Sequence, residues 1–254
     1  MPISLSGGNA FLTGAASGIG QAVAIGYAKA GAASVFGCDL NAMDETEKQC
    51  KKVAANPNFT FIQHIMDVRK EDEVIAAVDK CVKDLSRIDY AANIAGIADS
   101  DVQTIDQKID EWDNVININL RGYTSNELKE FTPDRPTRGS VINMGSVGGL
   151  VALPGIRTSY VTSKHAIAGM TKSAAVSVGL QSIRVNSVNP GYIATPMVKA
   201  AYDDLTPFGE PVALKRMGEA DEIADVIIFL SSSESSYITG SSITADGGLT
   251  IMPR

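Results

Sequence analysis

A glycine-rich turn near the start of the chain places the strongest constraint on its fold. Residues 9–13 (NAFLT) have the composition of a short buried strand, Gly14 to Gly20 (GAASGIG) follow at once, and a helical pattern continues to Gly31. Glycines let the backbone turn tightly and let a ligand approach it. Because the free N–H groups and the dipole of a helix N-terminus favour negative charge, this unit predicts an anion site. The spacing is G-x-x-x-G-x-G rather than G-x-G-x-x-G, so a turn without a ligand is the alternative.

An acidic residue ends the second apolar run. Residues 33–38 (ASVFGC) predict a strand, and Asp39 follows it, 19 residues after Gly20. Dinucleotide-binding folds place a ribose-binding acid about 20 residues beyond the glycines. A carboxylate there accepts the ribose hydroxyls and repels a 2′-phosphate, and neither the alanines of the glycine turn nor the preceding cysteine offers a positive charge. We therefore expect NAD rather than NADP. Asp39 is alternatively a helix cap, and one residue can serve both purposes.

A tyrosine and a lysine lie four residues apart in the middle of the chain. If their segment is helical, the side chains of Tyr160 and Lys164 leave one face, one turn apart. A phenol has an ordinary pKa of about 10, and a neighbouring ammonium favours the phenolate and lowers that pKa. Ser146, 14 residues before Tyr160, offers a hydroxyl to the same substrate oxygen. The three residues predict an acid–base site for a carbonyl and alcohol pair. A solvated surface pair is the alternative for Tyr160 and Lys164 alone.

Several motifs together resemble the short-chain dehydrogenase/reductase family, in its single-domain form of about this length. The resemblance runs from about residue 6 to residue 248, and several motifs in the right order are more specific than any one of them. Ile94 stands where the family usually has a second asparagine, and Gly145 replaces a common serine. The motifs are TGAASGIG (13–20), NIAG (93–96), Asn119, Ser146, YVTSK (160–164), NPGYIATPM (189–197) and ITGSSITADGG (238–248).

The resemblance implies roles for particular residues. Tyr160 is the acid or base, Lys164 lowers the pKa of the phenol and holds the nicotinamide ribose, and Ser146 fixes the substrate oxygen. Asn119, favoured over Asn117 by the frame Asn-Leu-x-Gly, holds a water that links the lysine to solvent; alternatively its side chain satisfies a backbone carbonyl. Asp67 contacts adenine or, alternatively, caps a helix. The implied cofactor-binding residues are Gly14, Ser17, Gly18, Ile19, Gly20, Asp39, Asp67, Val68, Asn93, Ala95, Gly96, Tyr160, Lys164, Pro190, Gly191, Ile193 and Thr195.

Strand and helix patterns alternate along the whole chain. Six such alternations and a final strand predict an α/β fold: a Rossmann-type, doubly wound parallel sheet of seven strands in three layers. No linker divides residues 1–254, so we expect one domain, with substrate loops at 147–157 and 192–214. The candidate residues lie at the carboxyl ends of strands, where such sheets bind ligands. The predicted strands are 9–13, 33–38, 59–65, 88–92, 140–144, 183–188 and 241–245, and the predicted helices are 21–31, 40–55, 71–85, 112–133, 160–180 and 219–230.

Charge and composition narrow the classes of partner. The net charge of −7 argues against a nucleic acid or an anionic membrane. The three cysteines show no metal-ligand spacing and are an odd number, which suits a reducing compartment, so we expect no metal site. Because neither a targeting segment nor an apolar run long enough to span a bilayer is evident, we expect a cytoplasmic location.

These features predict an NAD-dependent short-chain alcohol dehydrogenase or ketone reductase that acts on CH–OH groups. The apolar segment 147–156 favours a hydrophobic small-molecule alcohol or ketone, such as a steroid, a terpenoid or another secondary metabolite. The resemblance implies a homodimer or homotetramer through helices 112–131 and 160–180. The alternatives are an NADP-dependent ketoreductase such as a 3-oxoacyl reductase, and a non-catalytic dinucleotide-binding sensor or scaffold. A sugar-nucleotide epimerase or dehydratase usually has a larger C-terminal domain than the roughly 60 residues after Pro190 allow.

Overall fold

One parallel sheet of seven strands runs through the centre of the protein in the computed structural model, which describes residues 3–5, 7–98, 104–122, 139–152, 158–201 and 203–252. The strand order is β3-β2-β1-β4-β5-β6-β7, and every neighbouring pair is parallel. The seven-stranded, doubly wound architecture predicted from the sequence is confirmed. The strands are β1 (Asn9–Thr13), β2 (Ser34–Asp39), β3 (Thr60–Ile65), β4 (Tyr90–Asn93), β5 (Gly139–Met144), β6 (Ile183–Pro190) and β7 (Ser242–Ala245).

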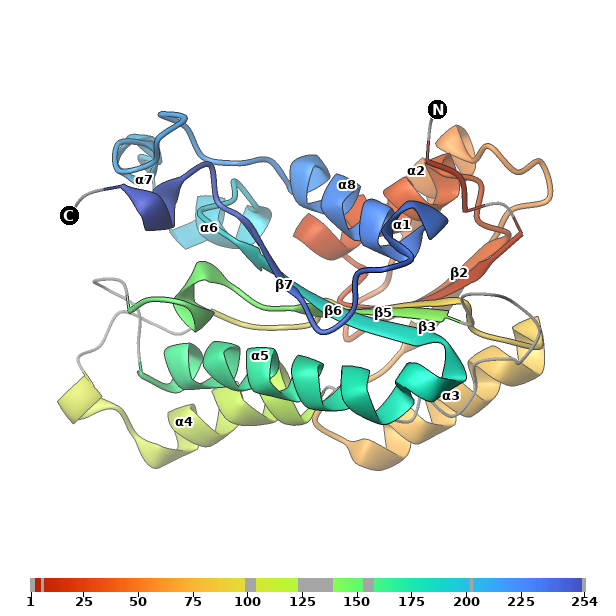
Figure 1. Cartoon of the computed structure of the whole chain (residues 1–254), viewed down its shortest axis with the longest axis horizontal. Helices are drawn as coiled ribbons and strands as arrows, with labels where there is room; N and C mark the ends of the chain where they lie inside the picture. The colour runs from red at the N-terminus through yellow and green to blue at the C-terminus, as the bar shows by residue number, and fades with distance from the viewer. Residues whose placement is uncertain are drawn as a thin grey trace.

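Helices cover both faces of the sheet and make three layers (Figure 1). Helices α1, α2 and α8 lie on one face, and α3, α4 and α5 lie on the other. Connections between parallel strands need such crossovers, which is why strand and helix patterns alternate in the sequence. The helices are α1 (Gly18–Lys29), α2 (Asp44–Val53), α3 (Glu71–Leu85), α4 (Ile109–Ile116), α5 (Thr158–Val178), α6 (Pro196–Ala201), α7 (Thr206–Gly209) and α8 (Ala220–Ser231).

The order of the strands reverses between β1 and β4. From β1 the chain moves outward through β2 to β3, and then returns to place β4 on the other side of β1. Consecutive crossovers on opposite sides leave a crevice at the carboxyl ends of the two central strands, and ligands of open α/β sheets bind there. The fold therefore positions the glycine-rich turn after β1 beside the segment that follows β4.

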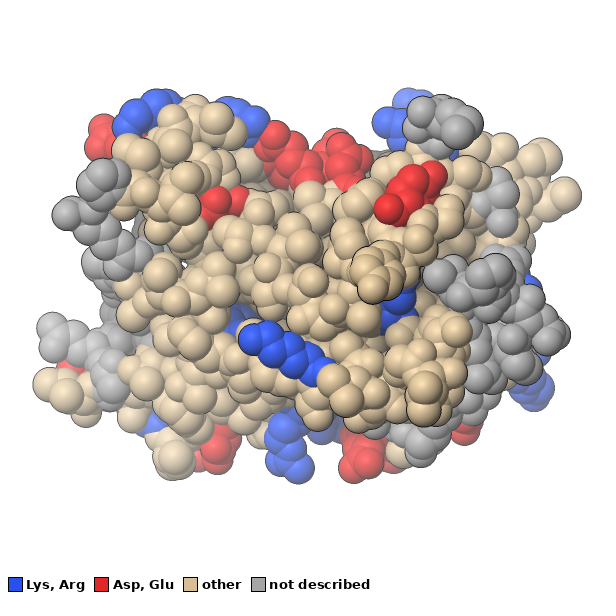
Figure 2. Space-filling model, in the orientation of Figure 1, with Lys and Arg blue, Asp and Glu red and all other residues tan. Residues whose placement is uncertain are grey.

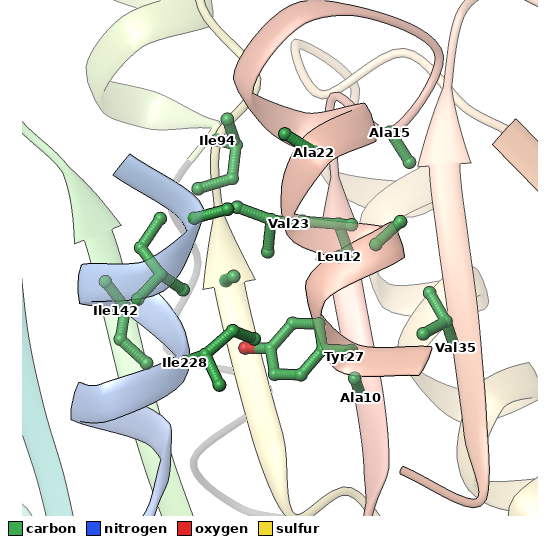
Figure 3. Packing of buried hydrophobic residues seen from close by; sticks show 14 of the residues in the cluster. Ala10, Leu12, Ala15, Ala22, Val23, Tyr27, Val35, Ile94, Ile142 and Ile228 are labelled. Carbon is green, nitrogen blue, oxygen red and sulfur yellow. The ribbon is translucent and has the colours of Figure 1, made fainter. Parts of the chain in front are cut away.

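The larger core lies between the sheet and the helices α1 and α8. Leu12 of β1, Tyr27 of α1 and Ile228 of α8 pack together there, as Figure 3 shows. The phenol of Tyr27 is fully buried, and its oxygen lies 3.0 Å from the hydroxyl of Ser231. A buried hydroxyl needs such a partner. A second core packs α3 and α5 against the opposite face of the sheet, so both faces of the central strands are buried.

Several element boundaries differ from the predictions. The second helix begins at Asp44 rather than at residue 40, and α4 begins at Ile109 rather than at Trp112. Helix α4 continues only as a π-helix over Asn117–Arg121, and the remainder of the predicted helix lies outside the described residues. The predicted loop 192–214 contains the short helices α6 and α7, and residues 153–157 of the loop 147–157 lie outside the described part. Within the described segments, the helices lack the combined length and apolarity that crossing a membrane demands.

Candidate active site

A cavity of about 540 Å³ opens at the carboxyl ends of the strands. Its volume is in the range of small-molecule and cofactor sites. It extends from the glycine-rich turn to Tyr160, so residues far apart in the sequence share one surface. Every predicted site residue lines it except Asn93 and Asn119. The predicted residues that line it are Gly14, Ser17, Gly18, Ile19, Gly20, Asp39, Asp67, Val68, Ala95, Gly96, Ser146, Tyr160, Lys164, Pro190, Gly191, Ile193 and Thr195.

The glycine-rich turn forms one end of the cavity. Gly14 has a φ of +75°, and a Cβ there would lie 2.8 Å from the backbone nitrogen of Ala95. A Cβ on Gly20 would lie 1.9 Å from the carbonyl oxygen of Gly14. Both positions therefore require glycine. Helix α1 begins here, and the side chain of its N-cap residue, Ser17, makes no capping hydrogen bond. The first N–H groups of α1 remain suited to an anionic group such as a pyrophosphate.

Asp39 lies at the end of β2 and faces this turn. One carboxylate oxygen accepts a hydrogen bond from the backbone nitrogen of Ala16 at 3.0 Å, and the other accepts one from the backbone nitrogen of Asn41 at 3.0 Å. Asp39 does not cap α2, because that helix begins five residues later with Met43 at its N-cap. Lys164, at the opposite end, is the one Lys or Arg among the described lining residues. Around Asp39 the described lining residues therefore present a carboxylate and no basic side chain.

Asp67 follows β3 and is engaged by a neighbouring arginine. A nitrogen of Arg69 lies 2.6 Å from its carboxylate, and this guanidinium holds the pKa of Asp67 below its ordinary value. The same arginine donates a hydrogen bond to the side chain of Asn114 on α4 at 3.2 Å. Asp67 does not cap α3, which begins at Glu71 after Lys70. Its carboxylate is held at the cavity wall by the ion pair.

Tyr160 and Lys164 lie on the first turns of α5, at the other end of the cavity. The ammonium nitrogen of Lys164 lies 5.6 Å from the centre of the Tyr160 ring and donates a hydrogen bond to the carbonyl of Met144 at 2.9 Å. Burial lowers the pKa of Lys164 to about 7. Burial also raises the pKa of Tyr160, against the opposing effect of its hydrogen bond with Ser146. In this structure burial thus has the largest effect on the pKa of Tyr160, and the lowering by Lys164 stays a prediction.

Asn119 and Asn93 lie behind the cavity wall. The fully buried side chain of Asn119 accepts a hydrogen bond from the backbone nitrogen of Ile97 at 2.8 Å and donates one to its carbonyl at 3.0 Å. It therefore satisfies the backbone of Ile97, while the bound water that the resemblance implies stays a prediction. A Cβ on Gly96 would lie 3.2 Å from this asparagine and 3.8 Å from the nitrogen of Lys164. Asn93 donates instead to the side chain of Asn143 in β5, at 3.1 Å.

Apolar side chains that the sequence analysis did not single out form the wall near Tyr160. Tyr192 and Phe208 meet edge to face with their ring centres 5.1 Å apart, and both line the cavity. Tyr192 also packs against a small cluster formed by Val147, Val212 and Leu249. Phe208 lies on α7, a four-residue helix too short to leave a periodic pattern in the sequence. Its only signal was its place inside the predicted substrate loop.

Comparisons with known proteins agree with this geometry. A family model described as enoyl-(acyl carrier protein) reductase matches residues 14–250. The chain is 36% identical to "Short-chain dehydrogenase srdC" of Neurospora crassa, over 96% of this chain and 97% of that protein. It is also 36% identical to "3-oxoacyl-[acyl-carrier-protein] reductase FabG" of Thermotoga maritima, over 97% and 99%.

Two solved structures with a cofactor in their descriptions share the fold. A putative 2-deoxy-D-gluconate 3-dehydrogenase from Agrobacterium tumefaciens, with bound NADP, has a TM-score of 0.85 and 31% identity over 98% of this chain and 99% of that one. Carveol dehydrogenase from Mycobacterium avium, in complex with NAD, has a TM-score of 0.89 and 26% identity over 98% and 99%.

The switch point, the glycine turn and the shared cavity define an α/β oxidoreductase of the nicotinamide dinucleotide type. The match to the family model narrows this class to one protein family. The chain belongs to the short-chain dehydrogenase/reductase family. The two positions that accept only glycine and the open N-terminus of α1 fit such a dinucleotide.

Proposed function

We propose that the protein transfers a hydride between NAD(H) and a hydrophobic secondary alcohol or ketone, without a metal. One observation carries this proposal: Ser146, Tyr160 and Lys164 share a single cavity with the glycine turn and Asp39. A site for proton exchange and a site for a dinucleotide are thus adjacent, as reversible oxidation of an alcohol requires. The nicotinamide supplies the hydride chemistry when it is bound. We propose a single domain over residues 1–254, with substrate segments at 147–157 and 192–214.

The site residues have separate proposed roles in the reaction. Tyr160 takes the proton of the alcohol during oxidation and returns it during reduction, and Ser146 holds the substrate oxygen beside it. Lys164 places a positive charge next to the phenol and holds the nicotinamide ribose. Asn119, whose side chain is held by the backbone of Ile97, would hold a water that links Lys164 to solvent. For the cofactor, the glycine turn (14–20) would hold the pyrophosphate, Asp39 the adenosine ribose, and Asp67 and Val68 the adenine. Ala95 and Gly96 would form the inner wall, which Asn93 supports from behind through its bond to Asn143. The nicotinamide would be held by Pro190, Gly191, Ile193 and Thr195.

The cofactor preference follows from Asp39. Because its carboxylate would face a 2′-phosphate with no arginine or lysine in the described lining to offset the repulsion, we expect NADH to bind at least tenfold more tightly than NADPH. Asp39→Ser should narrow that ratio towards one, chiefly by improving NADPH binding. Fluorescence titration with each cofactor measures the two dissociation constants and hence their ratio. Asp44→Ser, which alters net charge equally on exposed helix α2, is the control and should keep the wild-type ratio. Comparable wild-type affinity for NADPH would contradict the role given to Asp39.

The substrate class follows from the wall near Tyr160. Tyr192, Phe208 and Val147 present apolar surface there, and Lys164 already donates to a backbone carbonyl. We expect uncharged cyclic ketones and alcohols to be turned over with higher kcat/KM than small polar ones. Phe208→Ala should raise KM for such ketones about tenfold, since an apolar side chain contributes about 1.5–3 kcal/mol when it is buried. Phe208→Leu, which keeps most of the apolar surface, is the matched control.

The same assay separates the other candidate activities. The relative named as a 3-oxoacyl-[acyl-carrier-protein] reductase favours a β-ketoacyl thioester as the second candidate substrate. The panel therefore includes such a thioester together with cyclic ketones, each with NADH and with NADPH. A thioester reduced faster than every cyclic ketone would contradict the substrate class proposed here. Cofactor binding without turnover of any ketone or thioester would instead favour a non-catalytic sensor.

We propose a cytoplasmic homodimer or homotetramer that pairs through the helices 112–131 and 160–180. The helix at 160–180 carries exposed apolar side chains, for example Val176, which is 85% exposed. Acidic and basic side chains are interspersed on the face shown in Figure 2, and the net charge is −7, which supports the absence of a nucleic-acid partner. Light scattering measures the oligomeric state, and a monomer would contradict the proposal.

A further inference from the structure

Asn189, near the end of β6, makes a hydrogen bond that supports the segment carrying Ser146. Its side chain is 2% exposed, and its oxygen accepts a hydrogen bond from the backbone nitrogen of Ser146 at 3.2 Å. Its side-chain nitrogen has no hydrogen-bond partner among the described groups. A buried side-chain N–H without a partner costs free energy. Neighbouring residues must therefore hold the Asn189 side chain in contact with Ser146.

The surroundings are set by Gly145, which lies opposite Asn189. The β5–β6 ladder continues to a bond from the nitrogen of Gly145 to the carbonyl of Val188 at 2.8 Å. The next donor in a parallel ladder would be residue 190, but Pro190 has no N–H, so the backbone pairing ends here. A Cβ on Gly145 would lie 2.0 Å from the side-chain oxygen of Asn189. The carboxamide of Asn189 thus occupies the space above Gly145 and reaches the amide of the following residue.

The hydrogen bond with Asn189 fixes the main chain at Ser146, the residue whose side chain carries the reacting hydroxyl. The residue is extended, with φ of −171° and ψ of 159°, and its hydroxyl accepts a hydrogen bond from the backbone nitrogen of Gly148 at 3.0 Å. The same hydroxyl is hydrogen-bonded to Tyr160. The main chain of Ser146 is therefore held on one side by Asn189, and its side chain is held on the other by the turn that begins there.

We propose that Asn189 is a positioning residue that places the Ser146 hydroxyl against Tyr160 and the substrate oxygen, and that Gly145 is required to admit it. This inference rests on the proposed function, because it assigns Asn189 a role only through Ser146. It also explains why a polar side chain is retained in a strand whose residues are all buried. Asn186, three residues earlier in the same strand and so on its opposite face, bonds instead to the backbone of Ile238 and Ser241.

The test is a double-mutant cycle with full-length enzyme and the best ketone of the panel. Asn189→Ala should lower kcat about tenfold, the effect of losing one buried hydrogen bond, and leave the KM for NADH unchanged. In a Ser146→Ala background the same change should lower kcat less than twofold, since no hydroxyl remains to be placed. The pH limb assigned to Tyr160 should move to higher pH in Asn189→Ala, because the hydrogen bond with Ser146 favours its ionised form.

Two further variants separate positioning from stability. Gly145→Ala displaces the carboxamide without removing it, and should reproduce the loss of kcat and the shift of the pH limb even if Asn189→Ala folds poorly. Asn186→Ala is the matched control: it should lower Tm and leave the pH limb in place. Equal losses from Asn189→Ala with and without Ser146, or a lower Tm with an unmoved pH limb, would overturn this inference alone. Wild-type turnover in Ser146→Ala would overturn the proposed role of Ser146 itself.

Discussion

Tyr160→Phe loses turnover and keeps NADH binding: we expect kcat to fall by about 10²–10⁴, the usual contribution of a positioned general acid or base. The ring stays in place, so the cavity wall is preserved, but the group that exchanges a proton with the substrate is gone. The hydroxyl of Ser146 also loses the partner to which it is hydrogen-bonded. Steady-state kinetics measure the loss, and a fluorescence titration with NADH shows that the cofactor site is intact.

The control for this variant is the same chemical change at a distant tyrosine. Tyr237 is fully exposed, and Tyr237→Phe should keep wild-type kcat and KM. Turnover of Tyr160→Phe within tenfold of the wild-type enzyme would show that another group exchanges the proton. A large rise in the Kd for NADH would instead show that the phenol mainly supports cofactor binding, and this too would contradict the assignment.

The fold was predictable because the sequence repeats one local pattern. β1 is a run of buried residues (NAFLT) that ends in a glycine turn, and each of the first six strands is followed by helical residues before the next strand begins. The handedness of such crossovers leaves few arrangements open, so the strand order and the edge that carries the site follow together. The residues placed at that edge, from Gly14 to Thr195, reach one cavity for this reason.

The details that the sequence did not reveal depend on contacts between distant segments. Asn119 fits a motif, but only the fold shows that its amide binds the backbone of Ile97, 22 residues away. The helices α6 and α7 are too short for a periodic pattern, so Phe208 and its contact with Tyr192 were not foreseen. Whether burial or a neighbouring charge dominates the pKa of Tyr160 depends on how deeply α5 packs, which no spacing in the sequence records.

Lys164→Met should stabilise the protein while it removes most of the activity. Lys164 is 4% exposed, and burial lowers its pKa to about 7, from about 10.4 in an unfolded chain. Between these values the unfolded chain binds more protons, so the free energy of unfolding rises with pH across this window. Below pH 7 the folded protein must bury an ammonium, and a methionine of similar length does not. We expect a gain on the order of a few kcal/mol near pH 6 that shrinks towards pH 10.

Denaturant unfolding of both proteins at several pH values, without added cofactor, measures this difference. Lys172→Met, on an exposed position of the same helix, should leave the stability and its pH dependence unchanged. Turnover of Lys164→Met should fall by about 10²–10³, the typical cost of removing one electrostatic group from a site. A difference in unfolding free energy between Lys164→Met and the wild-type protein that stays constant with pH would contradict a buried ammonium. So would a variant less stable than the wild-type protein near pH 6. A residue whose removal stabilises the fold and abolishes turnover is retained for chemistry, because packing alone would favour an apolar side chain at that position.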